Sequence, residues 1–246
     1  MLSPDYSSWA KLYFQSRPQY PAALFRDLAQ LCEQRDRAWD CATGNGQAAL
    51  ALADHFASVV ATDQSAQQLS QAPRHPRIQY FVAAAERSGL APGSTDLVTV
   101  ATAVHWFDLT EFYRELERVL RPGGVIAVWA YHIAHLEAIC GDLLWAFYQD
   151  VVSSYFSAGA RLVDDRYAGI HLPGASIETG AYWMEANWNC NEVLTFVRSW
   201  SGTQQYIKRH GNDPTDSLKH DLCRLFMNEE AKHLLRWPLY LKVSRL

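Results

Sequence analysis

The first 130 residues alternate between short apolar segments and amphipathic segments of about ten residues, and this alternation leaves few architectures open. The apolar segments predict strands at residues 37–42, 58–62, 78–82, 96–104 and 125–129. Amphipathic segments between them, such as 111–120, predict helices. Strands that are joined by helices pair in parallel through right-handed crossovers. The sequence therefore predicts an α/β fold with a doubly wound, parallel sheet.

Beyond residue 131 this regular alternation is lost. The patterns predict a long helix over 136–156, an irregular segment over 164–180, a strand over 182–190 and two or three helices over 191–235. A short apolar segment at 239–243 predicts a last strand that returns to the sheet. We therefore expect a single domain, with a core of residues 1–131 completed by about 236–246 and a mainly helical cap of residues 132–235 inserted into it.

Composition argues against several classes of protein. The 246 residues are 49% hydrophobic, which is enough for a sizeable core and argues against general disorder. No apolar run approaches the length of about eighteen residues that a membrane span needs, and residues 1–22 lack the apolar block of a signal peptide. A formal charge of −4 without a basic cluster argues against a nucleic-acid partner and favours a small molecule. Five widely spaced cysteines are typical of a reducing compartment, so we expect a cytoplasmic protein of undetermined oligomeric state.

A loop of small residues follows the first predicted strand. Residues 40–46 (DCATGNG) end that strand and open the next helix, so backbone N–H groups there can approach a ligand closely. Asp63 lies seventeen residues after Gly46, at the end of the second strand, where a carboxylate can accept both hydroxyls of a ribose. Together these features indicate a nucleotide or nucleoside site. The alternatives are a tight strand-to-helix turn for the glycines and a helix N-cap for Asp63.

Two classes of cofactor suit this geometry. The spacing Gly44-x-Gly46-x-x-Ala49 matches the fingerprint of NAD-type enzymes. Asp40 lies four residues before Gly44, where it would repel a pyrophosphate but would suit a ligand with a cationic amine. S-adenosyl-L-methionine carries an amine, a ribose and a sulfonium, and it carries no phosphate. The charge therefore favours S-adenosyl-L-methionine, with an NAD-type oxidoreductase as the alternative.

Four segments give the chain a resemblance to a known family. They are residues 17–21 (RPQYP), 40–47 (DCATGNGQ), 101–108 (ATAVHWFD) and 118–124 (RVLRPGG). In order and spacing the chain resembles, over roughly residues 6–131, the class I S-adenosylmethionine-dependent methyltransferases, in particular the branch of trans-aconitate methyltransferase-like proteins. The resemblance implies a Rossmann-like fold with a mostly parallel, seven-stranded sheet. Ala42 departs from the family, which has a glycine there, and alanine fits if its φ angle is negative.

The resemblance also implies which residues hold the cofactor. The loop from Asp40 to Gly46 would hold its methionine part, Asp63 its ribose, and Arg17 its carboxylate, with a surface salt bridge as the alternative for Arg17. Gln64, Ala85 and Glu86 would border the adenine, and Ala101 and Ala103 would lie under the sulfonium. The full implied set is Tyr13, Arg17, Asp40, Ala42, Gly44, Asn45, Gly46, Asp63, Gln64, Ala85, Glu86, Ala101 and Ala103.

The methyl acceptor is expected at the carboxyl edge of the sheet. Methyl transfer is an in-line displacement that needs alignment and exclusion of water, and it needs a general base only for a protonated acceptor. His105 is the candidate base, with a structural hydrogen bond as the alternative. The candidate pocket residues are Trp106, Tyr131 and His132, with Tyr167, Trp183, Trp188 and Trp200 as further candidate walls from the cap.

The expected activity is methyl transfer to a small organic acceptor, with a carboxylate among the candidates. A module that binds S-adenosylmethionine without transferring its methyl group is one alternative, and a methyltransferase that acts on a macromolecule is another. His132 and His135 share the spacing of a helix face, but no third ligand has a clear position, so no metal site is predicted.

Overall fold

The main sheet has seven strands in the order β3-β2-β1-β4-β5-β9-β6 in the computed structural model, which describes residues 17–133, 136–157 and 159–246. The strands are β1 (Arg37–Cys41), β2 (Ser58–Asp63), β3 (Ile78–Val82), β4 (Thr95–Ala101), β5 (Leu120–Ala130), β6 (Ala175–Ile177) and β9 (Tyr240–Arg245). Strands β1 to β5 run parallel, and β9 is antiparallel to both of its neighbours. The predicted Rossmann-like, mostly parallel seven-stranded sheet is therefore confirmed. Its strand order reverses between β1 and β4, where ligands of such sheets bind.

Helices cover both faces of this sheet, as the residues of β5 show. The odd-numbered residues from 125 to 129 pack into the core that contains α2 (Ala22–Gln30) and α3 (Gln47–Leu52). The even-numbered residues from 126 to 130 pack with α5 (Leu109–Val119) on the opposite face. A strand that is buried on both faces needs a continuous apolar run, which is why the sequence revealed β5 so clearly.

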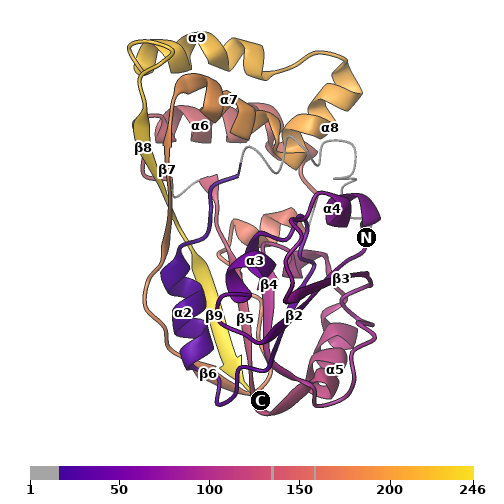
Figure 1. Ribbon diagram of the computed structural model, residues 1–246. Coiled ribbons are helices and arrows are strands. Elements are labelled where there is room, and N and C mark those ends of the chain that lie inside the picture. Colours follow the sequence, from indigo (N-terminus) through magenta and orange to yellow (C-terminus); the bar gives the residue numbers. More distant parts are fainter. Residues whose placement is uncertain (1–16, 134–135, 158) are drawn as a thin grey trace.

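The cap lies at the carboxyl ends of the parallel strands, at the top of Figure 1. Its helices are α6 (Gly141–Phe147), α7 (Cys190–Arg198), α8 (Ser201–His210) and α9 (Thr215–Leu225). Beneath them, β7 (Trp183–Trp188) and β8 (His233–Pro238) pair as a separate antiparallel sheet. Figure 1 shows that β7 and β8 run from the region of the main sheet up to these helices.

Residues 132–235 differ from the prediction in two respects. The long helix expected over 136–156 is divided into α6, a π-helical turn at Tyr148–Val152 and a 3₁₀ turn at Ser153–Tyr155. Within the segment predicted to be irregular, β6 pairs with β9 and so adds an edge strand to the main sheet. The predicted cap segment therefore also contributes to the core. With only three residues, β6 is too short to leave a periodic pattern in the sequence.

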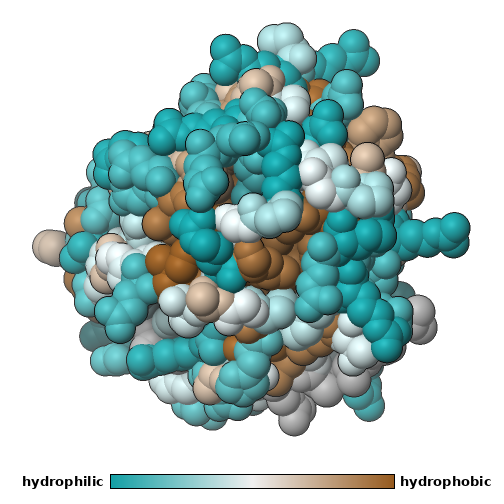
Figure 2. Space-filling view, turned by 90° about the horizontal axis from the view of Figure 1, so that it is seen from below, coloured by the Kyte–Doolittle hydropathy of each residue, from teal (hydrophilic) through white to brown (hydrophobic). Residues whose placement is uncertain are grey.

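The end of the sheet opposite the cap is held by charged side chains. Arg121, at the start of β5, contacts the carboxylates of Asp96 and Asp36 at 2.6 and 3.0 Å. Asp96 also accepts hydrogen bonds from the backbone N–H groups of Asp36 and Arg37. Hydrophilic residues cover most of this face, with small hydrophobic areas between them (Figure 2). Arg121 of the family-like segment 118–124 thus joins the starts of three strands, far from the cap.

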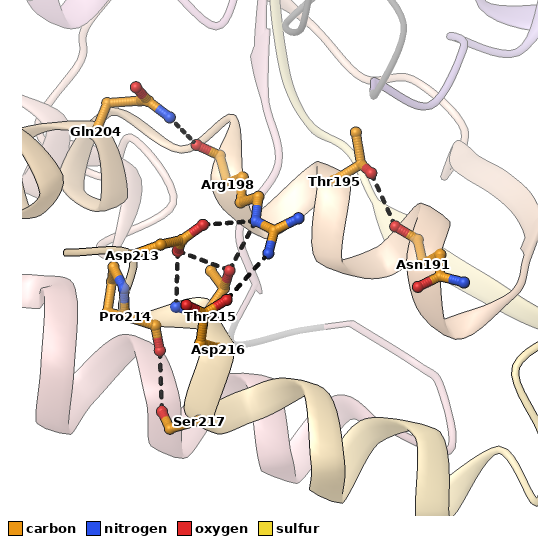
Figure 3. A network of polar contacts seen from close by, with 9 residues as sticks. All are labelled: Asn191, Thr195, Arg198, Gln204, Asp213, Pro214, Thr215, Asp216 and Ser217. Atoms are coloured by element: carbon orange, nitrogen blue, oxygen red, sulfur yellow. Dashed lines mark hydrogen bonds and ion pairs between the residues drawn. The ribbon is translucent and has the colours of Figure 1, made fainter.

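Within the cap, the Arg198 side chain at the end of α7 binds residues at the start of α9 (Figure 3). Its Nε lies 2.7 Å from Asp213 Oδ2 and 2.9 Å from Thr215 Oγ1. Asp213 Oδ1 in turn accepts hydrogen bonds from the N–H and the hydroxyl of Thr215. Burial raises the pKa of Asp213, but the Thr215 hydrogen bonds and the Arg198 charge outweigh it, so the pKa is lowered overall.

Asp213→Ala is expected to lower the free energy of unfolding by about 1–2 kcal/mol at neutral pH. Because folding lowers the pKa of Asp213 below its ordinary value of 3.8, this stabilisation is present above that pH and is lost as the pH falls through the folded-state pKa. Urea denaturation at neutral and acidic pH measures both effects. Asp216→Ala is the matched control, since that side chain is 75% exposed. An equal loss in both variants would contradict the role assigned to Asp213.

Candidate active site

A cavity of about 800 Å³ lies between the carboxyl edge of the main sheet and the cap. The loops after β1, β2, β4 and β5 line it on one side, and the aromatic side chains of Tyr148, Phe156, Phe196 and Trp200 line it from the cap. The predicted site residues that it brings together are Arg17, Ala42, Gly44, Asn45, Asp63, Gln64, Ala85, Ala101, Ala103, His105, Trp106, Tyr131 and His132. The predicted cofactor and acceptor regions thus share one space.

Asp63 at the end of β2 shapes the loop after β1. Its Oδ2 accepts a hydrogen bond from the N–H of Gly44 at 2.9 Å, and its Oδ1 accepts one from the N–H of Ser65 at 2.8 Å. Ser65 then caps the short helix α4 (Ala66–Ser70). Burial raises the pKa of Asp63, while the two N–H donors oppose that rise. Each carboxylate oxygen keeps a second lone pair with which to accept a hydroxyl of a ligand.

Asp40 lies beneath this loop and does not line the cavity. It is fully buried, and its carboxylate accepts hydrogen bonds from the hydroxyls of Thr43 and Thr99. Burial raises its pKa to about 6, against the effect of the two hydroxyls. The expectation that Asp40 binds the cofactor directly therefore needs correction. Asp40 fixes Thr43, and only its charge can act on a ligand.

Two further predicted residues also lie outside the cavity lining. Gly46 is the N-cap of α3, in the left-handed region at φ +85°, and a Cβ there would lie 2.8 Å from the Tyr80 hydroxyl. Glu86 Oε1 accepts a hydrogen bond from the N–H of Asp108, just before α5. These two residues support the backbone around the site. Tyr13 and His135 lie outside the described residues.

The residues of the loop fit S-adenosylmethionine. A Cβ added at Gly44 would meet no protein atom within 4 Å, so the backbone there is open to a ligand. The Asn45 amide nitrogen is buried and has no hydrogen-bond partner among the described residues. Because a buried unpaired donor is costly, this nitrogen is suited to a ligand carboxylate. Together with the Asp63 carboxylate, these groups match the methionine and ribose parts of the cofactor.

Comparison with known proteins gives the same family. Residues 39–128 match the model of the methyltransferase domain. A solved structure from Anaeromyxobacter dehalogenans, described as a type II methyltransferase, is 34% identical and covers 93% of this chain and 97% of its own, with a TM-score of 0.85. The chain belongs to the class I S-adenosylmethionine-dependent methyltransferases. A Dictyostelium discoideum methyltransferase is 28% identical over 98% of this chain and 94% of its own. A Saccharomyces cerevisiae protein named as an S-adenosylmethionine-dependent methyltransferase is 24% identical over 88% of this chain and 85% of its own.

Ala42 in this methyltransferase has a φ angle of +54°, so the condition of a negative φ is not met. The left-handed region costs a residue with a Cβ about 1–2 kcal/mol, which the loop bears because Gly44 and Asp63 hold it in place. Alanine therefore stands where glycine would be less strained. The loop of residues 40–46 thus adopts a left-handed conformation at position 42 although that residue is alanine.

Ala42→Gly is expected to raise the free energy of unfolding of the methyltransferase by about 0.5–1 kcal/mol, because relief of strain exceeds the entropy that glycine loses. Urea denaturation measures this. Ala91→Gly, at an exposed position without positive φ, is the control and should not stabilise the chain. A destabilised Ala42→Gly variant would contradict the left-handed geometry of the loop.

Arg17 and Tyr131 meet at the wall of the cavity. Arg17 Nη1 donates a hydrogen bond to the Tyr131 hydroxyl at 2.9 Å, and its guanidinium lies 5.2 Å from the centre of the Phe196 ring. Arg17 thus connects the N-terminal segment, the end of β5 and the cap helix α7. It faces the ligand space, which disfavours the alternative of a surface salt bridge.

His105 of the methyltransferase is held by Tyr167, whose hydroxyl lies 2.7 Å from His105 Nδ1. Burial lowers the pKa of His105 to about 4, so the imidazole is neutral at physiological pH and is a weak base. This favours the structural alternative for His105. The His105 ring also contacts Trp106, with 4.7 Å between ring centres, and both line the cavity.

Several cavity residues of the methyltransferase were not predicted from the sequence. Thr102 has a φ angle of +55°, and Tyr20 lies 3.4 Å from its hydroxyl. Both belong to family-like segments, so a signal for them existed. Phe156 and Phe196 carry no local signal, because only the folded cap brings them to the sheet edge. Of the further candidate walls, Trp200 lines the cavity, whereas Trp183 and Trp188 are not among its lining residues.

Proposed function

We propose that this methyltransferase transfers the methyl group of S-adenosylmethionine to a small organic acceptor that is bound between the sheet edge and the cap. The observation that supports this is the cavity itself, which joins the Gly44 loop and Asp63 to the aromatic side chains of the cap. A volume of about 800 Å³ is in the range of small-molecule sites. The described helices include none long and apolar enough to cross a membrane.

The cofactor would be held mainly by residues that line the cavity. When bound, S-adenosylmethionine supplies an electrophilic methyl group on a sulfonium sulfur. Asn45 and the open backbone at Gly44 would bind its carboxylate, and Asp63 would accept its ribose hydroxyls. Gln64 and Ala85 would border the adenine, while Ala101 and Ala103 would lie under the sulfonium. Arg17, with Tyr13 from the preceding segment, would close over the ligand.

The cap would align the acceptor and exclude water from the reaction. Phe156, Phe196 and Trp200 offer apolar, aromatic walls opposite the cofactor loop. Such walls strengthen the electrostatic interactions inside the cavity and hold the acceptor in line with the methyl group. A carboxylate acceptor, suggested by the resemblance to trans-aconitate methyltransferase-like proteins, would need no base. A hydroxyl acceptor would need one.

Methyl-tritiated S-adenosylmethionine tests the proposal. The protein is incubated with the small-molecule, protein and RNA fractions of a cell extract in separate reactions. We expect label in the small-molecule fraction, and none in the other two. Label in protein or RNA alone would overturn the class of acceptor. Binding of S-adenosylhomocysteine without label in any fraction would overturn the transferase activity itself.

A further inference from the structure

His132 and Asp164 form a close pair beside the cavity, with an imidazole nitrogen against a carboxylate oxygen. His132 follows β5 by two residues and lines the cavity, and only 10% of its side chain is exposed. Its Nε2 lies 2.8 Å from Asp164 Oδ1. The Tyr148 hydroxyl donates a further hydrogen bond to the same carboxylate at 3.1 Å. Asp164 itself is 37% exposed, so the pair connects the cavity with solvent.

The short distance between Nε2 and the carboxylate oxygen assigns the ring nitrogens of His132. An ionised carboxylate only accepts hydrogen bonds, so Nε2 carries the proton and Nδ1 carries the lone pair. A carboxylate in this position holds the imidazole in one tautomer and stabilises the imidazolium that forms when Nδ1 takes up a proton. The exposed carboxylate also lies where the proton can pass on to water.

The other histidine at this edge is unsuited to the same task. His105 contacts a neutral tyrosine hydroxyl instead of a carboxylate, and burial lowers its pKa to about 4. A base of that strength removes a proton from a hydroxyl poorly. His105 and His132, which both line the cavity, thus differ in the partner that holds the ring.

We infer that His132 is a catalytic base and Asp164 its positioning residue, and that the acceptor carries a neutral hydroxyl on an aromatic body. This inference rests on the proposed function. The hydroxyl oxygen forms a bond to the methyl carbon while its proton passes to His132 Nδ1. The carbon–sulfur bond breaks with its electron pair on sulfur, which leaves a neutral thioether. The aromatic walls Phe156, Phe196 and Trp200 favour a phenol over an aliphatic alcohol.

Matched probes test the acceptor class. The wild-type protein is given methyl-tritiated S-adenosylmethionine with 4-propylphenol or with 4-propylbenzoate. We expect label in an alkali-stable ether of the phenol and not in an alkali-labile ester of the benzoate. Label in the benzoate, or in neither probe, would overturn the hydroxyl assignment. Label in the small-molecule fraction of the extract would then still support the proposed function, so the two failures are distinguishable.

Asp164→Asn tests the pair. General-base catalysis contributes about 10²–10⁴-fold, so we expect kcat for 4-propylphenol to fall by about 10²-fold or more with little change in KM. The loss should be much smaller for 4-nitrophenol, whose hydroxyl ionises without help. Asp165→Asn removes the same charge at the next, exposed position and should leave both rates unchanged. Equal losses for the two phenols would indicate a structural role and overturn the inference.

A measurement without turnover complements these rates. In the wild type, the Nε2 proton of His132 should give a downfield resonance in the proton NMR spectrum because it is bonded to a carboxylate. This resonance should disappear in Asp164→Asn and in His132→Gln, and it should persist in Asp165→Asn. Its persistence in Asp164→Asn would overturn the pair.

Discussion

Gly46→Ala is expected to lower the free energy of unfolding by about 2–4 kcal/mol, as measured by urea denaturation. Gly46 has a φ angle of +85°, and its added Cβ would lie 2.8 Å from the Tyr80 hydroxyl and 3.2 Å from the Ala72 Cβ. The Tyr80 hydroxyl donates a hydrogen bond to the Pro73 carbonyl, so it cannot move away without losing that bond. In Gly46→Ala, backbone strain and the steric conflict with Tyr80 therefore both lower the free energy of unfolding.

Gly93→Ala is the matched control for this variant. Gly93 has a φ angle of +56°, and a Cβ there meets no atom within 4 Å, so the control carries backbone strain alone. We expect it to lose about 1–2 kcal/mol. If Gly46→Ala and Gly93→Ala lost the same free energy, the contact of Gly46 with Tyr80 would be of no consequence.

Gly44→Leu is expected to weaken the binding of S-adenosylhomocysteine by about 10²-fold or more, or about 2.7 kcal/mol. Gly44 lines the cavity, and its Cβ position is open, so a leucine side chain there would occupy space that the ligand needs. The fold has room for the side chain. The loss of stability should therefore be limited to the cost of the φ angle of +57°, about 1–2 kcal/mol.

Gly93→Leu separates these two effects. Gly93 has nearly the same φ angle and equal open space, but it precedes β4 at the other end of the sheet, away from the cavity. Calorimetric titration and urea denaturation should show similar losses of stability in both leucine variants and a loss of affinity only in Gly44→Leu. Undiminished affinity of Gly44→Leu would place the cofactor elsewhere.

The core and the cofactor loop were predictable because their signals are local. The strand β5, buried on both faces, contains a continuous apolar run, and the loop of residues 40–46 directly follows the short buried strand β1. The position of Asp63 at the end of the second predicted strand marked it as a site residue, and the structure bonds it to that loop. These signals did not show which residues of the loop would contact a ligand. Asp40 lies at the predicted position, but its carboxylate is bonded to the Thr43 hydroxyl and does not line the cavity.

The acceptor side was less predictable because it depends on long-range packing. His132 was a candidate pocket residue, but its partner Asp164 lies 32 positions further along the chain, in a segment without periodic pattern. The conformation of Ala42 was also hidden, since a φ angle leaves no trace in the sequence when alanine replaces glycine. The contact between His132 and Asp164 forms only when the cap folds onto the sheet.

The central claim is that the cavity binds S-adenosylmethionine through the loop after β1 and Asp63. The most direct test is calorimetric titration of S-adenosylhomocysteine into the wild type, Asp63→Ala and the control Asp54→Ala. Asp54 is an exposed acidic residue just after the C-terminal end of α3. We expect a wild-type dissociation constant on the order of micromolar, unchanged in Asp54→Ala and raised about 10²-fold in Asp63→Ala, which loses two hydrogen bonds to a charged group. A folded wild type that does not bind, or an Asp63→Ala variant that binds equally well, would contradict the account.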